Sequence, residues 1–119
     1  MALIHAKPGQ PIAIAPLGAD LRQASTHALL KTQSLELIRL VLRAGEALPP
    51  HQVRGELTLL CLEGEVEVAM DGRVCLLRAD ELLLLSADVQ HSVRAQQDSS
   101  LLLTIQLPAG TPGSASSTG

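Results

Sequence analysis

The chain has 119 residues, a formal net charge of −3 and 46% hydrophobic residues, but no Phe, Tyr or Trp. A chain of this length is expected to form one domain with its own core. The small excess of acidic residues argues against binding to nucleic acid or to an anionic membrane surface. Without aromatic rings there is no platform for base stacking, no cage for a quaternary amine and no Tyr acid, so any core is aliphatic.

The sequence predicts neither a secretory signal nor a membrane-spanning helix. Residues 1–9 lack the charged and apolar regions of a secretory signal, and no apolar run approaches the roughly 20 residues of a membrane helix. We therefore expect a cytoplasmic protein. Cys61 and Cys75 have no CxxC spacing and are too few for a disulfide framework, so both are expected to be free thiols in the core.

Residues 1–34 are expected to form an N-terminal arm and a connector. Pro8 and Pro11 stand in the arm, and residues 12–15 are predicted to add a short edge strand. Residues 20–31 remain open between two interpretations. Asp20 is suited to cap a short helix, whereas Thr26 and Thr32 favour extended chain.

From residue 35 onward the sequence changes to short apolar or alternating runs separated by turn residues, which is typical of an all-β fold. Seven strands are predicted, at 35–43, 57–62, 66–70, 73–77, 82–85, 90–95 and 101–107. Such a number of short strands indicates a sandwich or a barrel. Residues 108–119 are small and polar and are expected to form a flexible tail.

Two hairpins are predicted from turn residues. Asp71-Gly72 suits a type I′ turn, which needs positive φ at both central positions, and it pairs Val68 with Cys75. Glu63-Gly64 is predicted to close a second two-residue turn. Strand alternation then gives one core-facing side, on which two cysteines lie about 10 Å apart, too far for a disulfide; this side carries Leu57, Leu59, Cys61, Val66, Val68, Met70 and Cys75.

Two of the four histidines stand at suggestive places. His51 follows a rigid Pro-Pro pair, and His91 begins a later strand. If the odd-numbered positions of both segments face inward, both imidazoles enter the barrel. Two histidines in an apolar pocket can bind a divalent cation or act as acid and base on a small ligand. The alternative is a hydrogen-bonded pair of core histidines.

Two stretches of the sequence resemble the two motifs of the cupin superfamily. Residues 45–64 keep the first motif's spacing of Gly45, His51 and Gly64, and residues 79–95 resemble the second motif, with Asp80 and His91 in place. The chain is identified as a member of this superfamily, as a small single-domain cupin. The resemblance implies a double-stranded β-helix, or jelly-roll barrel, over residues 35–107.

The resemblance also implies a metal site, made by two histidines and a glutamate of the first motif and one histidine of the second. His51 and His91 match two of these positions, but Val53 and Leu57 stand at the other two, and Glu56 faces the other way on strand alternation. Two imidazoles alone imply no metal or a weakly held divalent one, Zn, Ni or Cu rather than Fe or Mn. The candidate further ligands are Gln52, Gln90, His5 and His27, and the alternative for the two histidines is that they are ordinary surface residues.

We therefore expect a cupin that binds a small, mostly apolar molecule in the barrel without catalysis. The residues expected to line this site are His51, Val53, Leu57, Leu59, Met70, His91 and Val93. The alternative is a metal-dependent enzyme of the dioxygenase or isomerase type that uses His51 and His91. A third interpretation is a structural module. A homodimer is expected, formed through residues 12–14 or through leucines on a sheet face.

Overall fold

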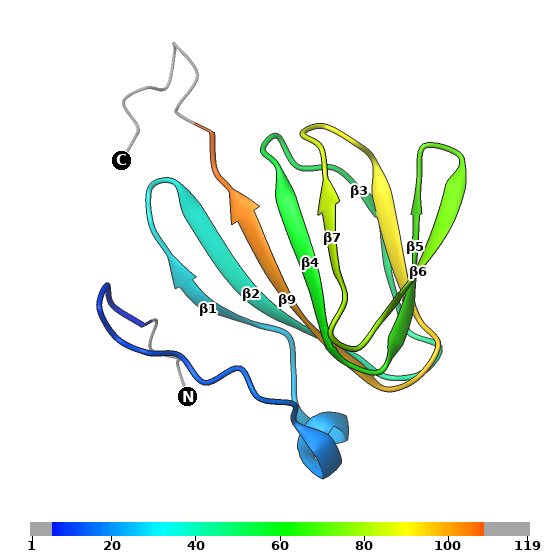
Figure 1. Ribbon diagram of the computed structural model, residues 1–119, viewed down its shortest axis with the longest axis horizontal. Coiled ribbons are helices and arrows are strands. Elements are labelled where there is room, and N and C mark those ends of the chain that lie inside the picture. Colours follow the sequence, from blue (N-terminus) through cyan, green and yellow to red (C-terminus); the bar gives the residue numbers. More distant parts are fainter. Residues whose placement is uncertain (1–5, 109–119) are drawn as a thin grey trace.

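A computed structural model describes residues 6–108, which form two antiparallel sheets that face each other (Figure 1). The all-β fold expected from the sequence is confirmed. The five-stranded sheet has the order β1 (His27–Lys31), β2 (Leu35–Leu42), β9 (Ser99–Gln106), β4 (Leu57–Glu63) and β7 (Leu82–Leu85). The four-stranded sheet has the order β3 (Ala47–His51), β8 (His91–Ala95), β5 (Glu65–Met70) and β6 (Arg73–Arg78).

The hairpin predicted at Asp71-Gly72 joins β5 to β6 as expected. Asp71 has a φ of 45° and Gly72 a φ of 75°, the positive values that a type I′ turn requires. Val68 is paired with Cys75, which confirms the predicted register. The alternation within β5 follows: Val66, Val68 and Met70 are buried, and the residues between them are half-buried.

The hairpin predicted at Glu63-Gly64 is wrong, because β4 and β5 belong to different sheets. Gly64 has a φ of +87° and lies against Ser99 and the Asp98 carbonyl, so the chain turns tightly there and crosses from one sheet to the other. Short apolar runs on both sides of a glycine are compatible with a hairpin within one sheet and also with a crossing between two sheets. Cys61 and Cys75 are both free thiols, as expected. The reason differs from the predicted one, because the two cysteines lie in opposite sheets.

No strand was predicted between residues 43 and 57, and this is wrong because β3 lies there and contains both Pro49 and Pro50. The structure tolerates them because β3 is an edge strand, whose outward N–H groups need no partner. The register between β3 and β8 shifts between Leu48 and His51, where the prolines stand. A proline pair in this sequence therefore marks an edge rather than a break.

The N-terminal segment contains one 3-10 helix, η1 (Gly18–Gln23), and no strand at residues 12–15, so the predicted edge strand is wrong. The arm is held differently: the Ala6 N–H donates to the Leu29 carbonyl, and the Arg39 guanidinium donates to the Ala15 carbonyl over 3.0 Å. The open stretch 20–31 contains both the end of η1 and β1. In the described residues no helix has the length and hydropathy to cross a membrane.

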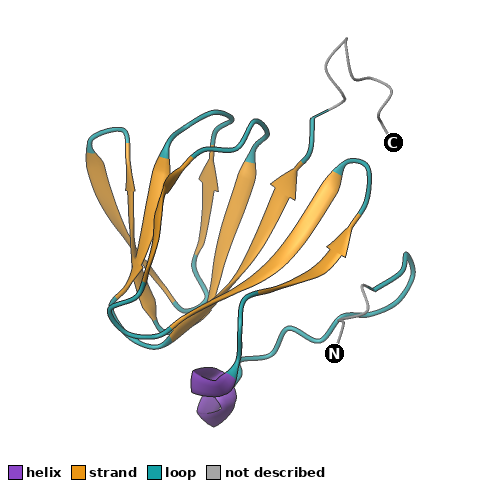
Figure 2. Cartoon of the chain, turned by 180° about the vertical axis from the view of Figure 1, so that it is seen from behind, coloured by secondary structure: helices purple, strands orange, loops and turns teal. Residues whose placement is uncertain are grey.

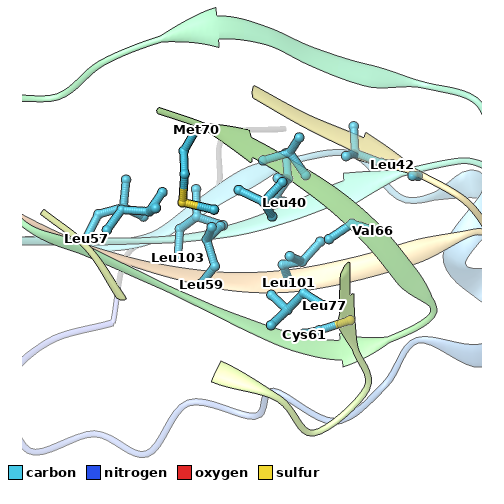
Figure 3. Packing of buried hydrophobic residues seen from close by; sticks show 14 residues of the cluster. Leu40, Leu42, Leu57, Leu59, Cys61, Val66, Met70, Leu77, Leu101 and Leu103 are labelled. Atoms are coloured by element: carbon cyan, nitrogen blue, oxygen red, sulfur yellow. The ribbon is translucent and has the colours of Figure 1, made fainter. Parts of the chain in front are cut away.

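The space between the two sheets is filled by aliphatic side chains (Figure 3). Leucines come mainly from the five-stranded sheet, and valines mainly from β5 and β8. The cluster contains Leu40, Leu42, Leu57, Leu59, Cys61, Val66, Val68, Met70, Leu77, Leu85, Val93, Ala95, Leu101 and Leu103. Every core-facing residue predicted from strand alternation belongs to this cluster except Cys75, which is half-buried and packs against it.

Glu63, the last residue of β4, connects the N-terminal segment to the barrel. Figure 2 shows η1 at the end of the barrel where the strands converge. The carboxylate of Glu63 accepts the N–H groups of Leu17 and Gly18 over 2.8 and 3.0 Å, and also the Ser100 hydroxyl. Burial raises the pKa of Glu63, but these hydrogen bonds and the charge of Arg39 outweigh it, so the pKa lies below its ordinary value. The ionised carboxylate is therefore part of the fold.

Substituting Gly64 by Ala tests the crossing between the sheets. The matched control is Gly45→Ala, because Gly45 has almost the same φ, +88°, but no atom within 4 Å of the added Cβ. We expect about 1–2 kcal/mol of destabilisation for the control, from φ alone, and about 1–3 kcal/mol more for Gly64→Ala, from the overlap with Ser99. Urea denaturation measures both, and equal losses would contradict the close contact.

Substituting Glu63 by Gln tests the carboxylate. An amide brings its own donors to the N–H groups of Leu17 and Gly18, so we expect a loss of about 1–3 kcal/mol at neutral pH. Folding lowers the pKa of Glu63 below its ordinary value of 4.5. The contribution of its carboxylate to stability is therefore complete above pH 4.5 and is lost as the pH falls through the pKa of the folded state. The exposed Glu46, which accepts the Arg43 N–H, is the matched control. Urea denaturation at falling pH should show less acid sensitivity in Glu63→Gln than in Glu46→Gln.

Candidate functional site: a histidine pair at one end of the barrel

His51 and His91 stand next to each other at the end of the barrel where the β5–β6 hairpin turns (Figure 1). His51 is the last residue of β3 and His91 the first of β8, and the two are direct partners in the ladder between these strands. Their ring centres are 4.3 Å apart, with the ring planes inclined by 57°. The structure therefore brings together the two histidines that the sequence singled out.

Both imidazoles are held in the same tautomer by the chain just before them. Nδ1 of His51 lies 3.1 Å from the Pro49 carbonyl oxygen, and Nδ1 of His91 lies 3.1 Å from the Val89 carbonyl oxygen. A carbonyl oxygen only accepts, so each Nδ1 carries the proton that it donates. Each Nε2 then presents a lone pair, which is the arrangement of a histidine prepared to accept a proton or bind a metal ion.

His91 is buried in a way that leaves one atom unsatisfied. Its side chain belongs to a residue only 2% exposed, and its Nε2 is the buried side-chain N or O atom without a hydrogen-bond partner in residues 6–108. Burial lowers the pKa of His91, and the neighbouring His51 lowers it further, against the opposing effect of the hydrogen bond to Val89. The ring is therefore neutral at neutral pH.

The other residues expected to line the site are mostly packed in the core. Leu57, Leu59 and Val93 are at most 2% exposed and Met70 is 7% exposed, while Val53 is half-buried and packs against the cluster. Leu57 and Leu59 come from the five-stranded sheet, opposite the histidines. The interior behind the histidine pair is thus filled by aliphatic side chains, and the polar atoms lie at its end.

A surface depression of about 470 Å³ lies beside the pair but on the outer side of the four-stranded sheet. Its floor includes Ala69 and Ser92, which are ladder partners and face away from the core because their neighbours Met70 and His91 face inward. Sequence reasoning missed it. The sequence feature that indicates it is a pair of small residues, Ala69 and Ser92, at outward positions of adjacent strands, where they leave space below the Asp71-Gly72 turn. Met70 and His91 are also among its lining residues, so the depression borders the histidine end of the barrel.

The described residues do not offer the four-ligand metal site that the resemblance implies. No group of three or more His, Cys, Asp or Glu side chains gathers anywhere in residues 6–108. Glu56, Gln52 and Gln90 are all exposed, and His27 lies in β1 with its ring on the Ser25 carbonyl. His5 lies outside the described residues. The donor set thus consists of two imidazoles, and a hard ion that needs carboxylate oxygen does not fit it.

Restoring the two missing ligands tests the geometry of this end of the barrel. We expect Val53→His combined with Leu57→Glu to lower stability without metal, because a carboxylate replaces a side chain that is 2% exposed. Zn²⁺ at a hundred times its Kd should return about 2.7 kcal/mol, measured as a rise in Tm, whereas Val53→His with Leu57→Gln should gain far less. An equal response of both variants would show that residue 57 does not face the histidines.

Comparison with known proteins agrees with the resemblance. The profile of the cupin domain family matches residues 38–106, which is more than half of the chain. A comparison with curated protein sequences found no match to this chain. Among solved structures, an RmlC-like cupin from Desulfovibrio desulfuricans is similar at 28% identity and a TM-score of 0.69, over 83% of this chain and 99% of its own.

Two further structures show the same fold at lower identity. A conserved protein of unknown function from Streptococcus pyogenes has 18% identity and a TM-score of 0.71, over 92% of this chain and 100% of its own. A double-stranded β-helix cupin from Methanocaldococcus jannaschii has 15% identity and a TM-score of 0.67, over 82% of this chain and 93% of its own. With two facing antiparallel sheets and the family profile matched along them, this chain belongs to the cupin family and has its double-stranded β-helix fold.

Proposed function

We propose that this cupin binds a small ligand at the histidine end of its barrel and does not catalyse a reaction on it. The observation that carries the proposal is the buried Nε2 of His91, which has no hydrogen-bond partner in residues 6–108. A buried acceptor without a donor costs about 1–3 kcal/mol. A ligand that supplies a hydrogen-bond donor to this atom recovers the cost.

The surroundings of the pair define the ligand. Leu57, Met70 and Val53 contribute apolar surface, and both Nε2 atoms are acceptors. A compact, mostly apolar molecule with one or two hydrogen-bond donors matches this combination. The opposite face of the barrel interior is closed by packed leucine, so such a ligand enters only to the depth of the imidazoles.

The same geometry favours binding over acid–base catalysis. Each imidazole is oriented by a backbone carbonyl, of Pro49 or Val89, rather than by a carboxylate that would stabilise its protonated form. Burial lowers the pKa of His91, so this ring is a poor general acid at neutral pH. His91 therefore acts as a neutral hydrogen-bond acceptor.

A metal-dependent enzyme of the dioxygenase or isomerase type is the second candidate. The observation in its favour is that both histidines present Nε2 with Nδ1–H fixed, the state in which histidine binds metal. The two aliphatic residues at the other family ligand positions, Val53 and Leu57, argue against it.

A titration with small aliphatic alcohols and amides, followed by NMR of the histidine rings, tests the binding proposal. We expect the Nε2 resonance of His91 to shift with saturation in the wild-type protein. Val53→Phe should block access and abolish the shift. Leu84→Phe, at a residue 59% exposed on the outer side of β7, is the matched control and should bind as the wild type does. A response that is equal in both variants, or that spares His91, would contradict the proposal.

A further inference from the structure

The strand β7, at one edge of the five-stranded sheet, presents leucine to solvent (Figure 1). Leu82 and Leu84 are 63% and 59% exposed and face outward, whereas Leu83 packs against the core cluster and Leu85 belongs to it. The ladder between β7 and β4 is regular along all four residues. Within residues 6–108 the backbone of β7 has no hydrogen-bond partner outside that ladder. Its free side therefore carries unpaired N–H and C=O groups beside two exposed leucines.

The other three sheet edges are protected against pairing with another chain. The ladder of β1 shifts its register next to Leu29, whose carbonyl accepts the N–H of Ala6. The strand β3 contains two prolines, and β6 begins and ends with arginine. Bulges, prolines and charged residues are the devices by which proteins keep edge strands from pairing. The strand β7 has none of them, and only its length of four residues limits how strongly it can pair.

The outer face of the five-stranded sheet is covered on one side and open on the other. On β2 the outward-facing Arg39 is only 4% exposed, and its guanidinium donates to the Ala15 carbonyl of the N-terminal segment. Within residues 6–108 no segment covers Leu82 and Leu84 on β7 to this extent. The ladder partner of Leu82 on β4 is Leu60, which is half-buried. The open part of this face is therefore apolar and reaches the sheet edge.

We propose that β7 pairs with β7 of a second copy of this chain, antiparallel and about a two-fold axis through Leu83. In this register Leu82 of each copy lies opposite Leu84 of the other, on the outer face of one continuous sheet. The pairing satisfies the free backbone groups of both strands and removes four leucine side chains from water. It concerns a surface separate from the histidine pair and does not depend on the binding function proposed above.

A second copy fits this edge because β7 is itself the kind of strand that the edge needs. The two-fold register also keeps the acidic residues apart, because it sets Glu81 opposite Leu85 and Asp80 opposite Ser86 of the other copy. The arrangement is closed. Once each copy has used β7, the remaining edges are the three protected ones, so no further strand is added. The expected assembly is therefore a dimer and not a fibre.

The size of the contact predicts a weak dimer. A stable interface buries about 800 Å² on each partner, and a strand of four residues with two outward leucines offers less. The side chains that dominate tight interfaces are mainly Trp, Tyr and Arg, and this chain has no aromatic residue. We therefore expect a dimer that dissociates on dilution between about 100 and 1 μM.

Sedimentation velocity of the full chain tests the pairing, with interference optics because no aromatic residue absorbs near 280 nm. We expect the sedimentation coefficient of the wild type to rise with concentration. Leu82→Lys combined with Leu84→Lys sets like charges opposite each other and should remain monomeric. Leu82→Glu combined with Leu84→Lys sets opposite charges across the same register, so its dimer should be tighter than that of the double lysine variant by about tenfold or more.

The matched control is Val74→Lys, at a residue 62% exposed on the other edge strand, β6, and it should associate as the wild type does. Far-UV circular dichroism and urea denaturation confirm that each variant is folded. A wild type that stays monomeric at about 100 μM would overturn the proposal. Equal association of the two double variants, or loss of association in Val74→Lys, would overturn it as well.

Amide hydrogen exchange at low and high protein concentration locates the contact without any substitution. We expect the amides of β7 to exchange more slowly at high concentration, because pairing engages their N–H groups, and those of β1, β3 and β6 to be unaffected. Concentration-dependent protection at one of these three strands in place of β7 would contradict the proposed pairing.

Discussion

Leucine side chains of the five-stranded sheet meet valines of β5 and β8 between the two sheets, and the other features of the molecule depend on this contact. Because the chain has no aromatic residue, many small aliphatic side chains must fill the space that a few rings would otherwise fill. The filling continues to the end of the barrel, where Leu57 is 2% exposed and Val53 packs on the cluster. These are two of the positions at which a cupin would be expected to place metal ligands.

The histidine pair places polar side-chain atoms at one end of this aliphatic interior. His51 and His91 retain their orientation because the carbonyl groups two residues earlier, of Pro49 and Val89, bind their Nδ1–H groups. This support is local and does not need the missing ligands. It leaves one buried acceptor unsatisfied, a cost that makes sense if something else supplies the partner. The polar side-chain atoms that the histidine pair brings to this end are therefore imidazole nitrogens.

The opposite end of the barrel is fixed by polar rather than apolar contacts. Glu63 accepts hydrogen bonds from Leu17, Gly18 and Ser100, and the neighbouring Gly64 lets the chain cross to the second sheet in a single tight turn. The two ends thus differ in their contacts: one holds the N-terminal segment through Glu63, and the other carries the buried His91 beside the half-buried His51.

The sequence by itself determined the all-β class, the Asp71-Gly72 hairpin and its register, because period-two alternation and turn chemistry act between near neighbours. It also determined which side of β4 and of β5 enters the core. Only the tertiary structure decided that Gly64 joins two sheets instead of closing a hairpin, and that Pro49 lies in an edge strand, since identical local patterns suit both arrangements. The pair of His51 and His91 likewise depends on β3 and β8 being neighbours, a long-range pairing that no spacing along the chain reveals.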